Sequence, residues 1–414
     1  MKITVVVDSI DRNDSSGSKA NVALIQNLAA CGFEVLVLHY TRKEIKIANT
    51  TCIAVKEKKS SLFYLLSRTE RIFTRITKIS LNRFLESQFG FSFTFFNDVN
   101  SIKGAIKKAI NFHPDLVITL SKGASFRPHY AILQLPELHN KWLAYIHDPF
   151  PFHFYPRPYN WVQPGYAQKE AFFAEVAEKA KFSAFPSQLL KDWMGSYFPN
   201  FLKTGKVIPH QLVEILTDDV DLPSYFDKSK FSVLHAGNLM KQRSPLALIK
   251  GYKKFLEHYP EATETTQLLL LGPASYYEKE LQKYKDKIPT LVVENRNVPF
   301  IEVVALQKQV AVNVILESKS EISPFLPGKF PHCIEANKPI LLLSPYYSEC
   351  KRLLGENYPY YTEVDDVEKI AVLIQKLYEL WKQTEGNMRL NRNDLMVYLS
   401  QENLKSVINQ FNLA

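Results

Sequence analysis

Short apolar runs alternate with longer amphipathic stretches along most of the chain. Residues 3–7 and 34–38 are runs of strand length, and residues 21–31 between them carry apolar side chains at helical spacing. Gly32 follows that stretch, at a place where glycine commonly ends a helix. The start of the chain therefore predicts a β-α-β unit, with the polar residues 8–19 as the loop after its first strand.

The same alternation recurs in both halves, which is typical of open parallel sheets with helices on both faces. A polar stretch at residues 217–230 separates the two series. We predict an α/β fold of two tandem doubly wound, Rossmann-like domains that face each other across a cleft. The expected domains are residues 1–215 and 216–385, followed by C-terminal helices at residues 386–414 that pack back toward the first domain. Further strands are expected at residues 115–120, 142–146, 182–185, 206–208, 231–235, 268–271, 290–293, 312–316 and 339–343.

The composition fits a folded chain of 414 residues, with 46% hydrophobic and 22% charged residues. The four cysteines are scattered and form no CxxC pair, which favours a reducing compartment. No apolar run reaches the roughly 18–20 residues that span a bilayer. The first apolar run is also too short for a signal peptide, so we expect a cytoplasmic protein.

The net charge of +9 attracts polyanions. Because the chain has no zinc-ligand pattern, no RNP motif and no basic tail, nucleic acid is not an expected partner. Part of the excess lies in residues 62–89, which hold five bases against two acids on an apolar, helix-spaced stretch. Two interpretations stay open: a helix on an anionic membrane surface, with a peripheral location, or a core-facing helix with a solvated basic face.

Ligands of open α/β sheets bind beyond the carboxyl ends of the strands, so polar residues after predicted strands are candidate site residues. Gly237 directly follows a predicted strand and lets a backbone approach a ligand closely. Lys241 and Arg243 follow in the same loop, and two cations there suit a diphosphate. A solvated turn with two surface bases is the alternative.

A second candidate is the loop at residues 323–332, where prolines and Gly328 surround the isolated Lys329. The loop runs into a helix that must be short, and a helix N-terminus with a lysine is an anion site. A proline-rich connection without a ligand is the alternative.

The first half offers weaker candidates. His147 and Asp148 follow the predicted strand 142–146, where a histidine either contacts a sugar hydroxyl, acts as an acid or base, or is structural. The aromatic and proline-rich residues 150–159 form either the wall of a cleft or a packed loop. Gly17 and Ser18 end the first loop, but GxGxxG and GxxxxGK[ST] are both absent, which argues against NAD and ATP.

Together these features resemble the GT-B glycosyltransferases, and within them glycosyltransferase family 4. The resemblance covers most of the chain and is strongest in the second half. Two glutamates eight positions apart are usual in the family, whereas Pro324 and His332 stand at those positions here and Glu335 lies one helical turn away. The motifs that carry the resemblance are Gly237-Asn238-Leu239 through Arg243, Pro327-Gly328-Lys329, Asn337-Lys338-Pro339, Pro186-Ser187 and Val207-Ile208-Pro209.

The resemblance implies a retaining transfer of a sugar from a nucleoside-diphosphate sugar to a cell-envelope glycan or lipid-linked acceptor. It implies no permanently bound cofactor and no metal. The alternatives are a GT-B sugar-nucleotide epimerase and a GT-B binding protein without catalysis. The implied donor-binding residues are Gly237, Asn238, Lys241, Arg243, Pro327, Gly328, Lys329 and His332. The implied catalytic residues are His147, Arg243 and Lys329, and the implied acceptor-side residues are Gly17, Ser18, His147 and Asp148.

Overall fold

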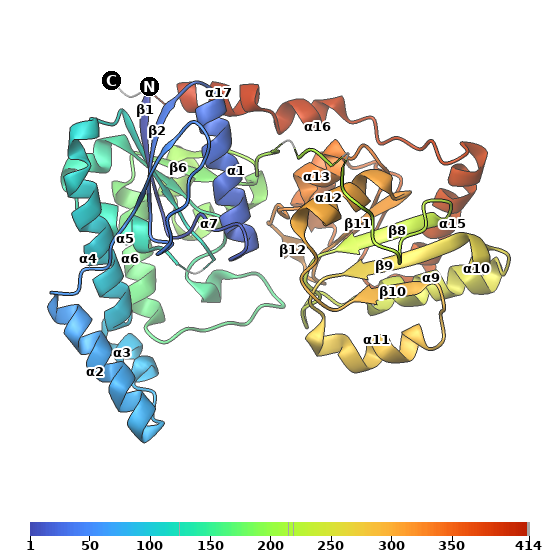
Figure 1. The fold of residues 1–414 in the computed structure, drawn as a ribbon, viewed down its shortest axis with the longest axis horizontal. Helices are drawn as coiled ribbons and strands as arrows, with labels where there is room; N and C mark the ends of the chain where they lie inside the picture. Colours follow the sequence, from blue (N-terminus) through green and yellow to red (C-terminus); the bar gives the residue numbers. More distant parts are fainter. Residues whose placement is uncertain (124, 214, 218, 412–414) are drawn as a thin grey trace. The chain divides into compact units, whose positions relative to one another are not determined.

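A computed structural model describes residues 1–123, 125–213, 215–217 and 219–411. These residues form two compact units (Figure 1). The first unit comprises Met1–Tyr155, Tyr159–Val213 and the chain from Leu399 on, and the second comprises Pro156–Pro158 and the chain from Glu214 to Tyr398. Within the described residues, no helix combines the length and the apolar character needed to cross a membrane.

The first unit is built on a seven-stranded parallel sheet with the order β3-β2-β1-β4-β5-β6-β7. Its central strands are buried on both faces because helices cover both (Figure 1). The strands are β1 (Lys2–Val7), β2 (Glu34–His39), β3 (Thr51–Ala54), β4 (Leu116–Leu120), β5 (Trp142–Tyr145), β6 (Phe182–Phe185) and β7 (Gly205–Val207). The α-helices are α1 (Ser16–Ala30), α2 (Leu62–Thr77), α3 (Asn82–Phe89), α4 (Phe93–Lys108), α5 (Arg127–Leu133), α6 (Tyr166–Lys179), α7 (Gln188–Tyr197), α8 (Asn200–Thr204) and α17 (Gln401–Asn409), and the 3₁₀ helices are η1 (Ile110–Phe112), η2 (Pro136–Lys141) and η3 (Phe152–Phe154).

The second unit has a six-stranded parallel sheet with the order β10-β9-β8-β11-β13-β15, and a separate pair of β12 with β14. Helices α9 and α15 pack against each other and against one face of the larger sheet. The strands are β8 (Phe231–Ala236), β9 (Thr266–Leu271), β10 (Leu291–Glu294), β11 (Val312–Leu316), β12 (Ile322–Ser323), β13 (Ile340–Leu343), β14 (Tyr347–Ser348) and β15 (Tyr361–Thr362). The helices are α9 (Leu246–His258), α10 (Ala262–Thr265), α11 (Glu278–Lys285), α12 (Phe300–Gln309), α13 (Phe330–Glu335), α14 (Glu349–Leu354), α15 (Val367–Gln383) and α16 (Asn393–Tyr398), with η4 (Ser275–Tyr277) before α11.

The predicted α/β class with two doubly wound sheets is confirmed, and every predicted strand is present with ends within two residues of the prediction. The predicted start of the first helix is wrong. Helix α1 begins at Ser16 because the Ser15 side chain caps it by accepting from the amide of Ser18 at 3.1 Å. Gly17 and Ser18 therefore lie in the first helical turn and not in the preceding loop.

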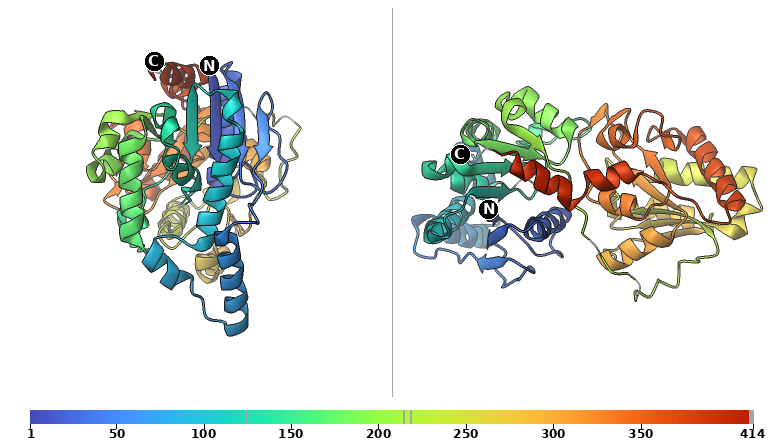
Figure 2. Two further views of the ribbon diagram at one scale, coloured as in Figure 1. Left: turned by 90° about the vertical axis from the view of Figure 1, so that its left-hand side faces the viewer. Right: turned by 90° about the horizontal axis from the view of Figure 1, so that it is seen from above.

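The end of the chain belongs to the first unit, where α17 packs beside α1 (Figure 2). Leu404 and Ile408 of α17 are buried in the same apolar cluster as β1 and α1. Helix α16, before it, groups with the second unit. The predicted linker at residues 217–230 contains no helix or strand among its described residues, and residue 218 lies outside them.

Candidate active site

Two glycine turns meet at the carboxyl edge of the second sheet. Gly237 follows β8 with a φ of +153°, and Gly272 follows β9 with a φ of +131°. The amide of Gly237 donates to the carbonyl of Leu271 at 2.8 Å, and a Cβ added to Gly272 would lie 2.5 Å from the Gly237 carbonyl oxygen. The two backbones therefore approach as closely as only glycine permits, and they leave the surface over Gly237 free of a side chain.

Lys329 reaches this bare backbone. Its Nζ lies 3.2 Å from where a Gly237 Cβ would stand and 3.3 Å from Nδ1 of His235. Burial, reinforced by the positive charge of Arg243, lowers the pKa of Lys329 to about 7. Burial and both of these cations hold the pKa of His235 well below its usual value, so His235 is neutral and its Nδ1 accepts from the lysine.

Glu317 stands directly after β11 at the same edge and is buried. Its Oε1 accepts from the hydroxyl of Ser348 at 3.0 Å. Burial raises the pKa of Glu317, while hydrogen bonds, Ser323 and Ser348 among their donors, and the charge of Arg243 oppose the rise. The other carboxylate oxygen, Oε2, and Nε of Arg243 are buried without a hydrogen-bond partner among the described residues. Such atoms in a polar site are available to a ligand.

The chemistry of this edge fits a diphosphate. Arg243 offers a planar set of N–H donors, and Lys329 offers an ammonium that burial leaves poorly hydrated. Gly237 allows phosphate oxygens to approach the main chain. A diphosphate bound here would lie beside two positive charges from two separate loops of the second unit.

The other predicted donor residues are spread more widely. Asn238 and Lys241 are exposed, and Nζ of Lys241 lies 6.0 Å from the ring centre of Tyr276. Pro327 and Gly328 form the turn before Lys329, where the Phe330 amide donates to the Pro327 carbonyl at 2.8 Å. Helix α13 has six residues, which is too short for the expected contribution of a helix N-terminus.

His332 is on α13, and its side chain is buried. Its Nδ1 lies 3.6 Å from Oε2 of Glu335, and its ring packs edge-on against Phe300 at 5.1 Å. Glu335 also pairs with Lys308 at 3.4 Å. At position 332 this chain has a histidine where the family usually has a glutamate. A glutamate, Glu335, follows one helical turn later and lies beside that histidine.

In the first unit His147 follows β5 by one residue and is fixed by a chain of hydrogen bonds. The carbonyl of Ser121 accepts from Nδ2 of Asn21 at 3.2 Å, which turns the Asn21 Oδ1 toward His147 Nε2 at 2.7 Å. An amide oxygen only accepts, so Nε2 carries the hydrogen and Nδ1 keeps its lone pair. Burial, with smaller effects from His210 and His129, holds the pKa of His147 well below its usual value.

Nδ1 of His147 is buried and has no hydrogen-bond partner among the described residues. It is therefore a fixed acceptor for a hydroxyl group and a weak base. Ser18 is fully buried one helical turn before Asn21, and Gly17 lies against Lys122. Asp148 is desolvated by burial, which raises its pKa to about 6 although Tyr155 donates a hydrogen bond to it.

Sequence inspection missed a polar cluster in the first unit and Glu317 in the second. Asp8 directly follows β1; it is buried, accepts from the Ser125 hydroxyl, and lies 3.8 Å from Arg127. Arg127 also pairs with Asp98 at 3.1 Å, and Asp98 accepts from Tyr40 at 2.7 Å. Burial raises the pKa of Asp8 against the charge of Arg127. The rule used above, a polar residue immediately after a strand, would have selected both Asp8 and Glu317.

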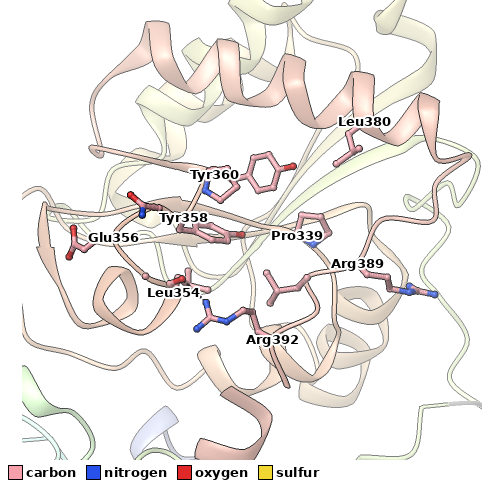
Figure 3. Close-up of a pocket in the computed structure, with 12 residues that line it drawn as sticks. Pro339, Leu354, Glu356, Tyr358, Tyr360, Leu380, Arg389 and Arg392 are labelled. Atoms are coloured by element: carbon pink, nitrogen blue, oxygen red, sulfur yellow. Dashed lines mark hydrogen bonds between the residues drawn. The ribbon is translucent and has the colours of Figure 1, made fainter. Parts of the chain in front are cut away.

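Two hollows of the second unit lie away from Lys329 and Arg243. A hollow of about 540 Å³ opens at the amino ends of β13 and β15, between Pro339, Tyr358 and Tyr360, with Arg389 and Arg392 at its margin (Figure 3). It lies at the opposite end of the strands from Lys329. A second hollow, of about 430 Å³, lies beyond the carboxyl ends of β11, β13 and β15. Its acidic lining residues are Glu321, Glu363 and Asp365. The first hollow is thus at the amino edge of the sheet, and the second carries mainly negative charge.

No cluster of three or more His, Cys, Asp or Glu side chains that could hold a metal ion occurs within the described residues. The predicted residues form two groups. Gly237, Arg243 and Lys329 come together in the second unit. In the first unit His147 is hydrogen-bonded to Asn21, which follows Ser18 by one turn of α1.

No protein-family profile and no curated protein sequence matches the chain. Solved structures do. HepE of Anabaena in complex with UDP and glucose is 11% identical over 99% of this chain and 98% of its own, with a TM-score of 0.61. The UDP-forming α,α-trehalose-phosphate synthase of Burkholderia xenovorans in complex with glucose-6-phosphate is 8% identical over 99% of both chains, also with a TM-score of 0.61. A glycosyltransferase from Rickettsia africae is 14% identical over 100% of this chain and 94% of its own, with a TM-score of 0.57.

These likenesses span the whole chain and establish its fold as that of the GT-B glycosyltransferases, as predicted. Membership of family 4 stays a prediction.

Proposed function

We propose that this protein is a GT-B glycosyltransferase that takes a sugar from a nucleoside-diphosphate sugar bound at the carboxyl edge of the second sheet. The observation that carries the proposal is Lys329 beside the bare backbone of Gly237, with Arg243 near enough for its positive charge to lower the pKa of the lysine. The described solved structures include one with UDP and glucose bound, which is consistent with such a donor.

The chemistry follows from charge. When the bond between the sugar and the diphosphate breaks, negative charge grows on the leaving phosphate. Lys329 and Arg243 would stabilise that charge more in the transition state than in the bound donor. Because Lys329 is already desolvated by burial, little reorganisation around it accompanies the reaction. No metal is needed in this scheme, since the two side chains supply the positive charge.

We further propose retention of configuration and an acceptor bound in the first unit. An inverting reaction needs a general base for the acceptor hydroxyl, and the low pKa of His147 makes its imidazole a poor one. As a fixed acceptor, His147 Nδ1 instead suits a sugar hydroxyl. Asp8 and Arg127 offer further hydrogen bonds at the same sheet edge. The acceptor we propose is a cell-envelope glycan or a lipid-linked sugar, met at the cytoplasmic side of a membrane.

A sugar-nucleotide epimerase would use the same donor site but needs carboxylates to move a proton. Glu317 is one such carboxylate in the second unit, so the experiment must also distinguish an epimerase from a transferase. A binding protein of the same fold would hold the nucleotide and turn nothing over.

Thermal unfolding with UDP, GDP, ADP and their sugars tests the donor site, with Arg243→Ala as the matched variant. We expect one nucleotide to raise the melting temperature of the wild-type protein and not of the variant. No stabilisation by any of them would refute the donor site. Product that forms only when an acceptor is supplied supports a transferase, product without acceptor supports an epimerase, and NMR of the product's anomeric proton decides retention.

A further inference from the structure

Helices α2 and α3 form a hairpin that extends past the sheet of the first unit (Figure 1; Figure 2, left). In α2 only Ser67 and Glu70 are buried, and α3 has no buried residue. Of the two interpretations of residues 62–89, the core-facing helix is therefore wrong, and the membrane-surface helix stays a prediction. Eight of the 23 exposed large hydrophobic side chains among the described residues fall within this short segment.

The exposed apolar side chains of α2 form one stripe. Leu62, Leu65, Ile72 and Ile76 are spaced by three, seven and four residues, which places them on the same face of a helix. Their exposed fractions are 68, 62, 57 and 76%. A monomeric protein rarely leaves such a contiguous stripe in water, so the face has an apolar partner. The other exposed apolar residues of the segment are Phe73, Ile79, Phe84 and Phe89.

The charges around the stripe are cationic. Its five bases are Arg68, Arg71, Arg75, Lys78 and Arg83. Its two acids are both paired: Glu70 is buried and accepts from Thr74 at 3.0 Å, and the half-buried Glu86 pairs with Lys169 at 3.2 Å. Two of the bases also have partners, since Arg68 lies 3.9 Å from Glu57 and Arg71 donates to Thr94 at 3.1 Å, so the free positive charge is mainly that of Arg75, Lys78 and Arg83. The surface offered to a partner is thus apolar with positive flanks. A surface of this kind complements a negatively charged, apolar one.

The hairpin is held in position before any partner arrives. Ser61 caps α2 by accepting from the amide of Tyr64 at 3.0 Å. At the other end, Nε2 of Gln168 donates to the last carbonyls of α3, Ser87 and Gln88, at 3.2 Å each. Binding through this face therefore needs no folding step.

We propose that the α2–α3 face binds the surface of an anionic phospholipid bilayer. The stripe enters the interface between headgroups and acyl chains, and the flanking bases contact the anionic headgroups. Neither contribution alone holds a protein on a membrane, but the two act together. The bilayer is favoured over a protein partner because the cationic side chains run beside the stripe from Arg68 to Lys78 and continue at Arg83, which matches an extended, uniformly negative surface. This inference does not depend on the transferase proposal.

Co-sedimentation of the full chain with vesicles tests the proposal, comparing phosphatidylcholine alone with phosphatidylcholine containing 30% phosphatidylglycerol. We expect binding to the anionic vesicles only. Replacing Arg75, Lys78 and Arg83 together by Gln should lower the partition coefficient roughly a hundredfold, because each base near an anionic surface contributes about fivefold. Matched neutralisation of Lys279, Lys283 and Lys287, which are exposed in the second unit, should leave binding within about twofold.

The apolar stripe has its own variant. Ile72→Ser with Ile76→Ser should lower the partition coefficient at least tenfold, whereas Val372→Ser with Val397→Ser, which are 46 and 67% exposed on the second unit, should not. Unchanged far-UV circular dichroism and an unchanged thermal shift with UDP show that the variants are folded and that the donor site is independent. Equal binding to both kinds of vesicle, or equal loss in the control variants, would overturn the proposal. So would a dimer in sedimentation velocity that the Ile72 and Ile76 changes dissociate while vesicles fail to bind.

Discussion

Lys329→Met removes the ammonium beside Gly237 and keeps most of the side chain's volume. If Lys329 contacts a diphosphate oxygen, the variant loses a hydrogen bond between charged groups, which contributes about 1.5–3 kcal/mol. The dissociation constant of UDP should then rise roughly 10- to 150-fold at pH 7. Isothermal titration calorimetry measures this directly.

The same substitution should stabilise the free protein. The pKa of Lys329 falls from 10.5 to about 7, which corresponds to roughly 5 kcal/mol against the charged form in the folded state. The folded protein therefore binds fewer protons than the unfolded chain between pH 7 and 10.5, and the penalty is fully present below pH 7 and fades as the pH rises. Since the protein relaxes around the charge, we expect about 1–2 kcal/mol of added unfolding free energy in the variant at pH 6.

The pH dependence of UDP binding gives a second signature. Binding needs the protonated lysine, so above pH 7 the wild-type affinity should fall by up to about tenfold per pH unit, measured between pH 7.5 and 8.5, above the last ionisation of the diphosphate and below that of uracil. The Lys329→Met affinity should be flat over this range. Lys338→Met is the matched control, because Lys338 is also half-buried with a lowered pKa but precedes β13, at the other edge of the sheet.

The reasoning is refuted if Lys329→Met binds UDP as the wild-type protein does, or if Lys338→Met weakens binding equally. A wild-type affinity that does not change between pH 7.5 and 8.5 would show that the Lys329 ammonium is not part of the donor site.

Three further predictions concern the rest of the two sites. Gly272→Ala should lower the unfolding free energy by about 2 kcal/mol or more in chemical denaturation, because its Cβ would lie 2.5 Å from the Gly237 oxygen, whereas Gly328→Ala, with open space around its Cβ, should be close to neutral. The His147 ring should show no titration in NMR between pH 5.5 and 8, since burial lowers its pKa, and a midpoint above 6 would contradict the neutral tautomer. Asp8→Asn should lower kcat/KM for the acceptor about tenfold or more and leave the UDP dissociation constant unchanged; a change in UDP binding alone would remove Asp8 from the acceptor side.

The fold could be predicted because strands that are buried on both faces appear in the sequence as short, continuous apolar runs. Residues 268–271 are four leucines in a row, as a strand covered on both sides requires, and they form the end of β9. The start of α1 could not be read from the apolar pattern, because Ser16 to Lys19 are polar or small and the cap depends on one serine side chain.

Part of the proposed donor site was predictable from local signals. A lysine isolated among prolines and a glycine after a strand are both visible in the sequence, and the structure brings Lys329 and Gly237 together. The role proposed for His147, a hydrogen-bond acceptor at Nδ1, was not predictable. The tautomer of its ring depends on Asn21, which lies 126 residues earlier. Periodicity also could not tell whether α2 faces the core or water, since both arrangements produce the same spacing of apolar residues.

The return of α17 to the first unit has a consequence for synthesis. The ribosome completes the whole second unit before it releases the helix that covers β1 and α1, so the first unit passes through a stage in which its apolar cluster around Ile3 and Leu28 is uncovered. A fragment that ends at residue 213 would stop permanently at that stage and would be prone to aggregate. The second unit, whose main segment is continuous from Glu214 to Tyr398, is the part of this chain that can be made alone.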